Sequence, residues 1–405
     1  MIWRRVFPRN LPDVIIPLHR DTVTLLVARA AGPAVTVILL ALLARQRGAE
    51  EVGLYGLAAA VFSLLEAASS LGFRHLLPRE MARVEDRALL GSAAVACLGV
   101  GTLLALIAGA MAVCLTVGQT SRVLVLVALA IPIAALAVPE EGYWIGVQRS
   151  GRLAATLLVE QAARLLAGLA LLRGNAPVEA LVGLLGLGRA VAVVLAIPPQ
   201  GFGFRRANRH TLRALARQVP VFLGLEAMFQ LYWRVDVLLL SALASLAEVG
   251  FYVAAFRIFS TLLLVPQSYG QILLPRMMKP GGERLLRRGI ADTLAMGIAL
   301  GLAAGAGASV AVRFLYGAGF DRAASVLVVL AFGMVLASVD QAQGRALVAR
   351  NRQGRDLAVL SVATVVNVWL NIILIPRYGA MGAAAATLLS LAVSVGGHAT
   401  ALRTK

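Results

Sequence analysis

Apolar residues fill long stretches of this chain, and short polar or charged gaps separate them. A stretch of roughly 18 such residues is long enough to cross a bilayer as an α-helix. A bilayer offers no partner for unpaired backbone groups, and these stretches lack the alternation of barrel strands, so we predict membrane-spanning helices. Twelve are expected, at 22–44, 52–73, 88–116, 123–147, 153–172, 178–198, 218–244, 249–274, 289–312, 323–344, 357–375 and 380–402.

Composition supports a membrane protein and excludes several other classes. Of 405 residues, 60% are hydrophobic and 14% are charged, whereas soluble domains carry about a quarter charged residues. The net charge of +18 does not indicate nucleic-acid binding, because the basic residues lie in the gaps rather than on one helix face. The four histidines are scattered without metal-ligand spacing, and no phosphate-binding loop is present. We therefore expect no metal, no cofactor and no ATP hydrolysis.

The basic residues between the stretches give the predicted helices a direction. Alternate gaps, counted from the N-terminal segment, hold 26 of the arginines and lysines, and the other gaps hold 7. Positively charged loops stay on the cytoplasmic side. Both termini should therefore be cytoplasmic, which agrees with an even number of helices. We expect a multi-pass protein of the bacterial cytoplasmic (inner) membrane.

An internal repeat divides the chain into two halves. Residues 51–55 read EVGLY and residues 248–252 read EVGFY, an offset of 197. The same offset aligns LLPR at 76–79 with LLPR at 273–276. Duplication explains such a match economically. Since the offset spans an even number of helices, the copies enter the membrane in the same direction.

The parallel repeat predicts the architecture. The fold class is an all-α polytopic membrane protein, with about 12 transmembrane helices in two six-helix bundles related as parallel repeats. The predicted domains are an N-terminal bundle at 1–198, a cytoplasmic linker at 199–217 and a C-terminal bundle at 218–405. Parallel repeats in transporters enclose a site between them and expose it alternately to the two sides. Alternating access is therefore the expected mechanism.

Three stretches of the second half carry a family resemblance. They are 234–277, which includes RVDVLLLSALASLAEVGFYVAAFRIFS, 314–336 (FLYGAGFDRAASVLVVLAFGMVL) and 367–390 (NVWLNIILIPRYGAMGAAAATLLS). With these stretches the chain resembles the polysaccharide (O-antigen type) flippases of the multidrug/oligosaccharidyl-lipid/polysaccharide exporter superfamily. The segment 51–72 is similar to the equivalent early helix of that family.

The resemblance implies a transporter rather than an enzyme. Its cargo would be a polyprenyl-pyrophosphate-linked oligosaccharide, moved from the inner to the outer leaflet for cell-surface polysaccharide or lipopolysaccharide synthesis. The expected partners are this lipid-linked cargo, bilayer lipid and other polysaccharide-assembly membrane proteins, with no nucleic acid. Many relatives have about fourteen helices, and with twelve expected here we do not expect the extra C-terminal pair, which forms a lipid-facing groove in some of them.

Charged residues inside the predicted spans are candidate site residues, because a charge at mid-membrane costs roughly 2.5–3.5 kcal/mol unless it faces a partner, water or substrate. Arginine binds phosphate through a planar fork of donors, so the buried arginines are the expected cavity residues for the pyrophosphate. They are Arg29, Arg164, Arg189, Arg234 and Arg257. The acids expected to couple to a proton or sodium gradient, or to pair with these arginines, are Glu66, Glu160, Glu226, Asp236 and Asp340.

Spacing gives some of these residues an expected geometry. Glu160 and Arg164 lie four apart on one helix face and can pair with each other. Arg234 and Asp236 lie two apart and point to different faces, so each needs another partner. Arg29 precedes Gly32-Pro33, where a kink is expected.

Two other functions remain open at this point. One is a drug or cation antiporter of the same fold, although the arginines favour an anionic substrate. The other is a membrane-embedded polysaccharide polymerase or ligase, which typically needs a sizeable extracytoplasmic loop. The outward gaps here are short.

Overall fold

The computed structural model describes residues 20–83, 86–199, 201–216, 219–277, 283–350 and 352–404. These residues form helices and short connections, with no strand in the described ranges. The helices are α1 (Arg20–Arg47), α2 (Ala49–Ser69), α3 (Phe73–Met81), α4 (Arg87–Leu115), α5 (Gly118–Gly146), α6 (Ser150–Arg173), α7 (Val178–Ala196), α8 (Arg209–Ala216), α9 (Val219–Leu243), α10 (Leu246–Met277), α11 (Glu283–Ala306), α12 (Ala308–Tyr316), α13 (Asp321–Ala349), α14 (Gln353–Tyr378) and α15 (Ala380–Arg403).

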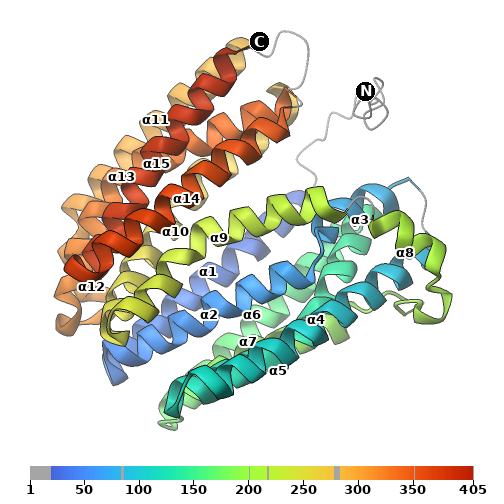
Figure 1. The fold of residues 1–405 in the computed structure, drawn as a ribbon, viewed down its shortest axis with the longest axis horizontal. Helices are drawn as coiled ribbons and strands as arrows, with labels where there is room; N and C mark the ends of the chain where they lie inside the picture. Colours follow the sequence, from blue (N-terminus) through green and yellow to red (C-terminus); the bar gives the residue numbers. More distant parts are fainter. Residues whose placement is uncertain are drawn as a thin grey trace.

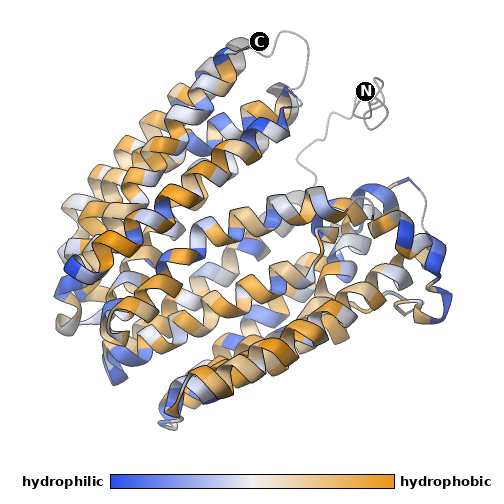
Figure 2. Cartoon of the chain, viewed as in Figure 1, coloured by the Kyte–Doolittle hydropathy of each residue, from blue (hydrophilic) through white to orange (hydrophobic). Residues whose placement is uncertain are grey.

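The predicted all-α membrane fold is confirmed. Eleven described helices are long and apolar enough to cross a bilayer, and they match eleven of the twelve expected spans. The remaining expected span, 218–244, is the 25-residue helix α9, which carries Glu226, Arg234 and Asp236. Figure 2 shows apolar residues along the helix surfaces, and polar residues gathered at helix ends and around α3 and α8.

The helices form two groups that join at one end and diverge at the other. The first group contains α1 to α7, and the second contains α9 to α15, with α9 packed on both α14 and α2. The groups meet where α2 and α10 begin, and they separate towards α3, α8 and the C terminus (Figure 1). At the joined end the Arg45 side chain donates to the carbonyl oxygens of Leu315, at 3.0 Å, and Phe314. The exact division into domains at 198 and 218 stays a prediction.

The duplicated segment adopts helix in both halves. α2 begins at Ala49 and α10 begins at Leu246, the 197-residue offset seen in the sequence. The copies differ at their far ends, since α2 ends at Ser69 while α10 continues to Met277. The first copy breaks at Gly72, whose φ of 73° is left-handed, a conformation in which glycine meets no steric cost. α3 then starts in a new direction.

The structure corrects two expected span boundaries. The second span was expected to reach residue 73, but its helix ends at Ser69 and α3 follows as a separate element. The ninth was expected to run unbroken over 289–312, but α11 ends at Ala306 and α12 begins at Ala308. α1, by contrast, stays helical through Pro33. A hydropathy pattern does not predict turns inside an apolar run, because the turn residues are themselves small or apolar.

Candidate functional site

A cavity of about 740 Å³ lies within the first helix group and reaches the second. α1, α2, α3, α5, α6 and α7 supply most of its walls, and α10 contributes Arg257. This volume is in the range of protein ligand pockets. Its charged and polar lining residues are Arg29, Thr36, Tyr55, Arg74, His75, Glu141, Glu160, Gln161, Arg164, Arg189 and Arg257.

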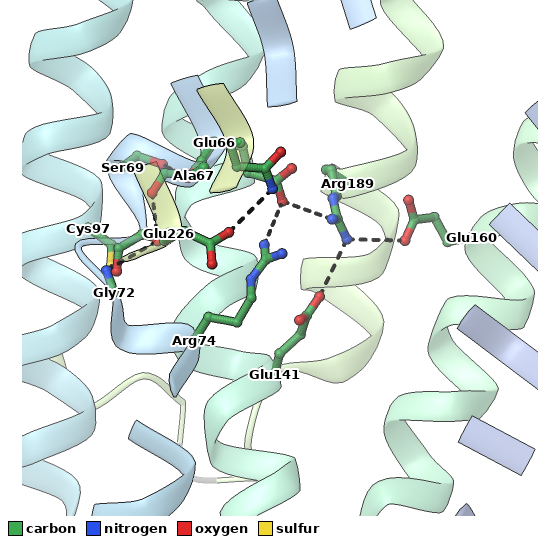
Figure 3. A network of polar contacts seen from close by, with 12 residues as sticks. Glu66, Ala67, Ser69, Gly72, Arg74, Cys97, Glu141, Glu160, Arg189 and Glu226 are labelled. Carbon is green, nitrogen blue, oxygen red and sulfur yellow. Dashed lines mark hydrogen bonds and ion pairs between the residues drawn. The ribbon is translucent and has the colours of Figure 1, made fainter. Parts of the chain in front are cut away.

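Arg189 on α7 is the centre of an ion-pair network on the cavity wall (Figure 3). Its Nη2 lies 2.8 Å from Oε1 of Glu66 on α2. Its Nη1 lies 3.6 Å from Oε1 of Glu141 on α5 and 3.6 Å from Oε2 of Glu160 on α6. All four side chains are largely buried. One guanidinium group therefore ties four helices together and partly offsets the charge of three acids that would be costly alone in the membrane.

The short helix α3 brings two more residues to this wall. Arg74 lies 3.5 Å from Oε1 of Glu66, so it shares that carboxylate with Arg189 (Figure 3). His75 Nε2 lies 3.1 Å from Oε2 of Glu226 on α9, and Gln230 donates to the other oxygen of Glu226 at 3.3 Å. The His75–Glu226 contact crosses from the first helix group to the second.

Arg164 and Arg257 line the cavity without an ion pair among the described residues. Arg164 donates to Oε1 of Gln161 at 3.1 Å, while its Nε is buried without a partner. The Nε of Arg257 is also buried without a partner. Burying a charged donor without a partner is expensive. These two guanidinium groups, one from each helix group, can therefore bind an anion in the cavity.

The other predicted arginines differ from this pair. Arg29 lines the cavity from α1 and is exposed, with no ion pair in the described part of the chain. Arg189 lines it but is already paired with three acids. Arg234, on α9, is not among the lining residues, although its Nε is buried without a partner. A role of Arg234 in binding the cargo therefore stays a prediction, and this cavity does not carry it.

A second polar cluster surrounds Asp236 inside the C-terminal group. Asp236 is 2% exposed, and the Tyr252 hydroxyl and the Asn371 amide donate to its two oxygens at 2.6 Å and 2.7 Å. The Thr387 hydroxyl lies 2.7 Å from the same carboxylate. No cationic side chain pairs with Asp236 within the described ranges. The described ion pairs include none between Arg234 and Asp236.

The remaining predicted acids all have basic partners. Glu66 and Glu160 pair with Arg189, and Glu226 pairs with His75. Asp340 on α13 lies 2.8 Å from His398 on α15. Glu160 and Arg164, whose spacing allows a pair, form no ion pair in the described part of the chain, and Glu160 lies 3.6 Å from Arg189 on α7 instead. Helical spacing permits a pair, but a competing partner on a neighbouring helix decides it.

Sequence reasoning missed three residues of the site. Glu141 lies inside the expected span 123–147, where a pair of adjacent acids in an apolar run was the available signal. Arg74 and His75 were assigned to a loop on hydropathy, and only the turn at Gly72 directs α3 back to the cavity.

Comparison with known proteins agrees with this architecture. A curated relative named as the probable low-salt glycan biosynthesis flippase Agl15, from Haloferax volcanii, is 24% identical over 398 residues, covering 94% of this chain and 83% of the relative.

Solved structures show the same fold. A structure of the lipid II flippase MurJ in an inward closed conformation matches with a TM-score of 0.78 and 14% identity, over 94% of this chain and 88% of that one. An inward-facing multidrug resistance transporter of the MATE family, in the MOP superfamily, matches with a TM-score of 0.73 and 13% identity, over 93% and 98% of the two chains. These relatives are named as flippases and transporters, in agreement with the prediction that the chain is not an enzyme.

The sequence profile of one family covers all of the first helix group and part of the second. It is described as "Polysaccharide biosynthesis protein" and matches residues 18–279, well over half of the chain. This match, the shared fold and the predicted resemblance agree, and the chain belongs to the polysaccharide biosynthesis protein family.

Proposed function

We propose that this protein is a flippase for a polyprenyl-pyrophosphate-linked oligosaccharide. It moves the headgroup from the inner to the outer leaflet by alternating access and so supplies cell-surface polysaccharide synthesis, of the O-antigen type. The observation that carries the proposal is the pair Arg164 and Arg257, which line one cavity from the two helix groups without acidic partners. The glycan flippase named among the relatives supports the same class of cargo.

Charge accounts for the preference for an anionic cargo. The acids that line the cavity, Glu141 and Glu160, both lie beside Arg189, and the lining arginines outnumber these acids. The guanidinium groups of Arg29, Arg164 and Arg257 line the wall without an ion pair to any described acid. A pyrophosphate offers several acceptor oxygens to such planar donors. A drug antiporter of the same fold would favour the opposite balance, with unpaired acids facing a cationic drug.

The joined and open ends of the molecule fit the predicted orientation. The two helix groups diverge on the side of α3, α8 and the C terminus (Figure 1). The excess of basic residues in the terminal segments and the alternate gaps places this side in the cytoplasm. We therefore propose a protein of the bacterial cytoplasmic membrane, open here to the cytoplasm, whose partners are its lipid-linked cargo and other assembly proteins.

The test is leaflet-to-leaflet movement of a fluorescent lipid-linked oligosaccharide in proteoliposomes that contain the purified protein. The wild-type protein is expected to make the probe accessible to a lectin outside the vesicles. The double variant Arg164→Ala/Arg257→Ala is expected to abolish this lectin accessibility. Arg122→Ala is the matched control, because Arg122 is exposed and pairs with Glu179 away from the cavity. Transport of a cationic dye without movement of the lipid probe would instead support the antiporter.

We further propose that Asp236 binds the coupling ion, a proton or sodium. Its carboxylate is buried, has no cationic partner within the described ranges and is surrounded by hydroxyl and amide groups. The Asn371 Oδ1 atom beside it is buried without a partner. A buried carboxylate without a counter-charge must take up a proton or a cation, and hard cations such as sodium take oxygen ligands.

Ion gradients applied one at a time separate the two ions. A proton or a sodium gradient should accelerate movement of the lipid probe, and Asp236→Asn should remove the response to that gradient while slow downhill movement persists. Asp321→Asn is the control, because Asp321 is exposed and pairs with Arg313. Equal responses of wild type and Asp236→Asn to both gradients would contradict the assignment.

A further inference from the structure

His398 joins three helices at the open end of the C-terminal group. It lies near the end of α15, and its side chain is almost fully buried. Its Nδ1 lies 2.8 Å from Oδ1 of Asp340 on α13, and its Nε2 lies 2.8 Å from Oδ1 of Asp356 on α14. Each ring nitrogen therefore faces its own carboxylate, and the cavity described above does not include any of the three residues.

The number of hydrogen atoms in this cluster follows from its geometry. A contact of 2.8 Å between a ring nitrogen and a carboxylate oxygen needs a hydrogen atom between them. A neutral imidazole carries one N–H, so it can satisfy only one of the two contacts. With both carboxylates ionised, the second nitrogen would place its lone pair against an oxygen lone pair. The cluster therefore holds one additional proton, on the ring or on one carboxyl group.

The neighbouring charged and titratable groups have other contacts. On α13, Arg345 donates to the Gln267 carbonyl oxygen. At the start of α14, Arg352 and Arg355 donate to main-chain oxygens at the end of α15. On α9 and α10, the tyrosine hydroxyls nearest this face of α15 belong to Tyr232 and Tyr252 and contact Ser390 and Asp236.

A line of hydroxyl groups runs along α15 from this cluster to Asp236. Thr387, Ser390, Ser394 and His398 are three or four residues apart, so they lie on one helix face, and all four are buried. Thr387 contacts Asp236, and the Asn367 amide donates to Ser390 at 3.2 Å. The rise of the helix from 387 to 398 is roughly 16 Å.

At Ser394 the line of hydrogen-bonded hydroxyl groups is interrupted. Its hydroxyl is buried and has no hydrogen-bond partner in the described part of the chain. A buried hydroxyl without a partner is costly, and a water molecule that also contacts its polar neighbours is the usual solution. With such waters, Ser394 connects the His398 cluster to Ser390 and the groups around Asp236.

We propose that Asp340, His398 and Asp356 form a proton-binding site, and that coupling protons pass between it and Asp236 along the hydroxyls of α15. The inference rests on the proposed flippase function and its coupling at Asp236. Asp356, the most exposed of the three side chains, takes a proton from water at the open end. His398 passes one on towards Ser394, and the cluster regains its original proton count.

The first experiment tests the proton site without any transport. Protein labelled with ¹⁵N-histidine and ¹³C-aspartate is placed in lipid nanodiscs at neutral pH, and His398→Gln assigns the ring signal. The expected spectrum shows hydrogen on both ring nitrogens, or a nitrogen sharing hydrogen with a protonated Asp340 or Asp356. Exposed His210 is the internal reference. A ring with one bare nitrogen beside two ionised carboxylates overturns the proposal.

The second experiment tests the path. Proteoliposomes with an internal pH dye report proton movement while lipid-linked oligosaccharide is flipped. His398→Gln and Ser394→Val are each expected to abolish proton movement driven by the cargo. Ser394→Val leaves the Asp–His–Asp cluster intact. Ser361→Ala is the matched control, because among the described residues this hydroxyl on α14 bonds only its own helix, at the Leu357 carbonyl.

The outcomes separate this inference from the proposed function. If His398→Gln and Ser394→Val both flip the lipid with unchanged proton movement, or if flipping is coupled to sodium alone, the proton path is contradicted and the flippase function is not. If the cluster is protonated but the wild-type protein moves no lipid-linked sugar, the proton site is supported and the flippase function is contradicted.

Discussion

Gly53 of α2 and Gly250 of α10 make equivalent contacts, each with the start of the helix that carries the other glycine. A Cβ atom on Gly53 would lie 1.9 Å from the carbonyl oxygen of Leu246, and one on Gly250 would lie 1.9 Å from that of Ala49. Each glycine thus packs against the first residue of the other helix. The duplicated motif is what lets the two helix starts touch and join the two helix groups at one end (Figure 1).

Gly250→Ala is expected to open this joined end. The atom that the new methyl group meets is main chain, which cannot move aside as a side chain does, and such overpacking costs about 1–3 kcal/mol. The cost applies only where the helix starts touch, so the equilibrium shifts towards the conformation that is open on that side. Distances between spin labels beside the start of α2 and on α12 should lengthen in reconstituted protein. Gly396→Ala, where a Cβ meets nothing within 4 Å, should leave them unchanged; equal distances in all three proteins would contradict the role of Gly250.

Arg189→Gln is expected to destabilise the first helix group. The substitution leaves Glu66, Glu141 and Glu160 buried around a neutral side chain, and removing one partner of a buried ion pair costs about 3–5 kcal/mol. Thermal unfolding of the purified protein in detergent measures the loss. The matched change is Arg122→Gln at an exposed pair with Glu179, expected to cost about 1 kcal/mol or less. Similar losses in both variants would show that the network has no structural role.

The two natural cysteines report the orientation of the chain. Cys114 is exposed near the end of α4, at the connection to α5, whereas Cys97 is fully buried in the same helix. With cytoplasmic termini, the α4–α5 connection faces outward. A membrane-impermeant maleimide should therefore label intact cells or spheroplasts at Cys114, and Cys114→Ser should abolish the labelling. Labelling only after the membrane is opened would reverse the proposed orientation.

Arg164→Lys is expected to retain part of the flipping activity that Arg164→Ala loses. Lysine keeps the positive charge but lacks the planar fork that binds two phosphate oxygens together, so a fall of roughly tenfold is expected, near 1.4 kcal/mol of binding. The initial rate of lipid-probe movement at limiting probe measures it. Full activity in the alanine variant would exclude Arg164 from the site.

The local sequence pattern predicted most of the fold. Length and apolarity decide whether a segment crosses a membrane, and both are visible in a stretch such as 88–116, which became α4. The repeat was visible in the sequence because the same motif occurs in both halves. In the structure the two copies pack against each other, and there is no room for a side chain at Gly53 or Gly250. The break at Gly307 was not visible, since the glycine that ends α11 lies within an otherwise apolar run.

The site was predicted in part, because charges inside apolar runs are conspicuous but their partners are not. Arg164, Arg189 and Arg257 line the cavity as expected, together with Arg29. Arg234 does not line it, and the acids beside Arg189 and His398 come from other helices.

The sequence by itself determined that this chain spans the membrane many times in two parallel copies, because hydropathy and repetition are properties of neighbouring residues. Only the tertiary structure decided which buried charges neutralise one another. Arg189 reaches acids on three other helices, whereas Arg164 and Arg257 form no ion pair with a described residue. The physical reason is that an ion pair in a low-dielectric interior depends on distances of a few ångströms between helices, and those distances are set by packing rather than by position in the chain.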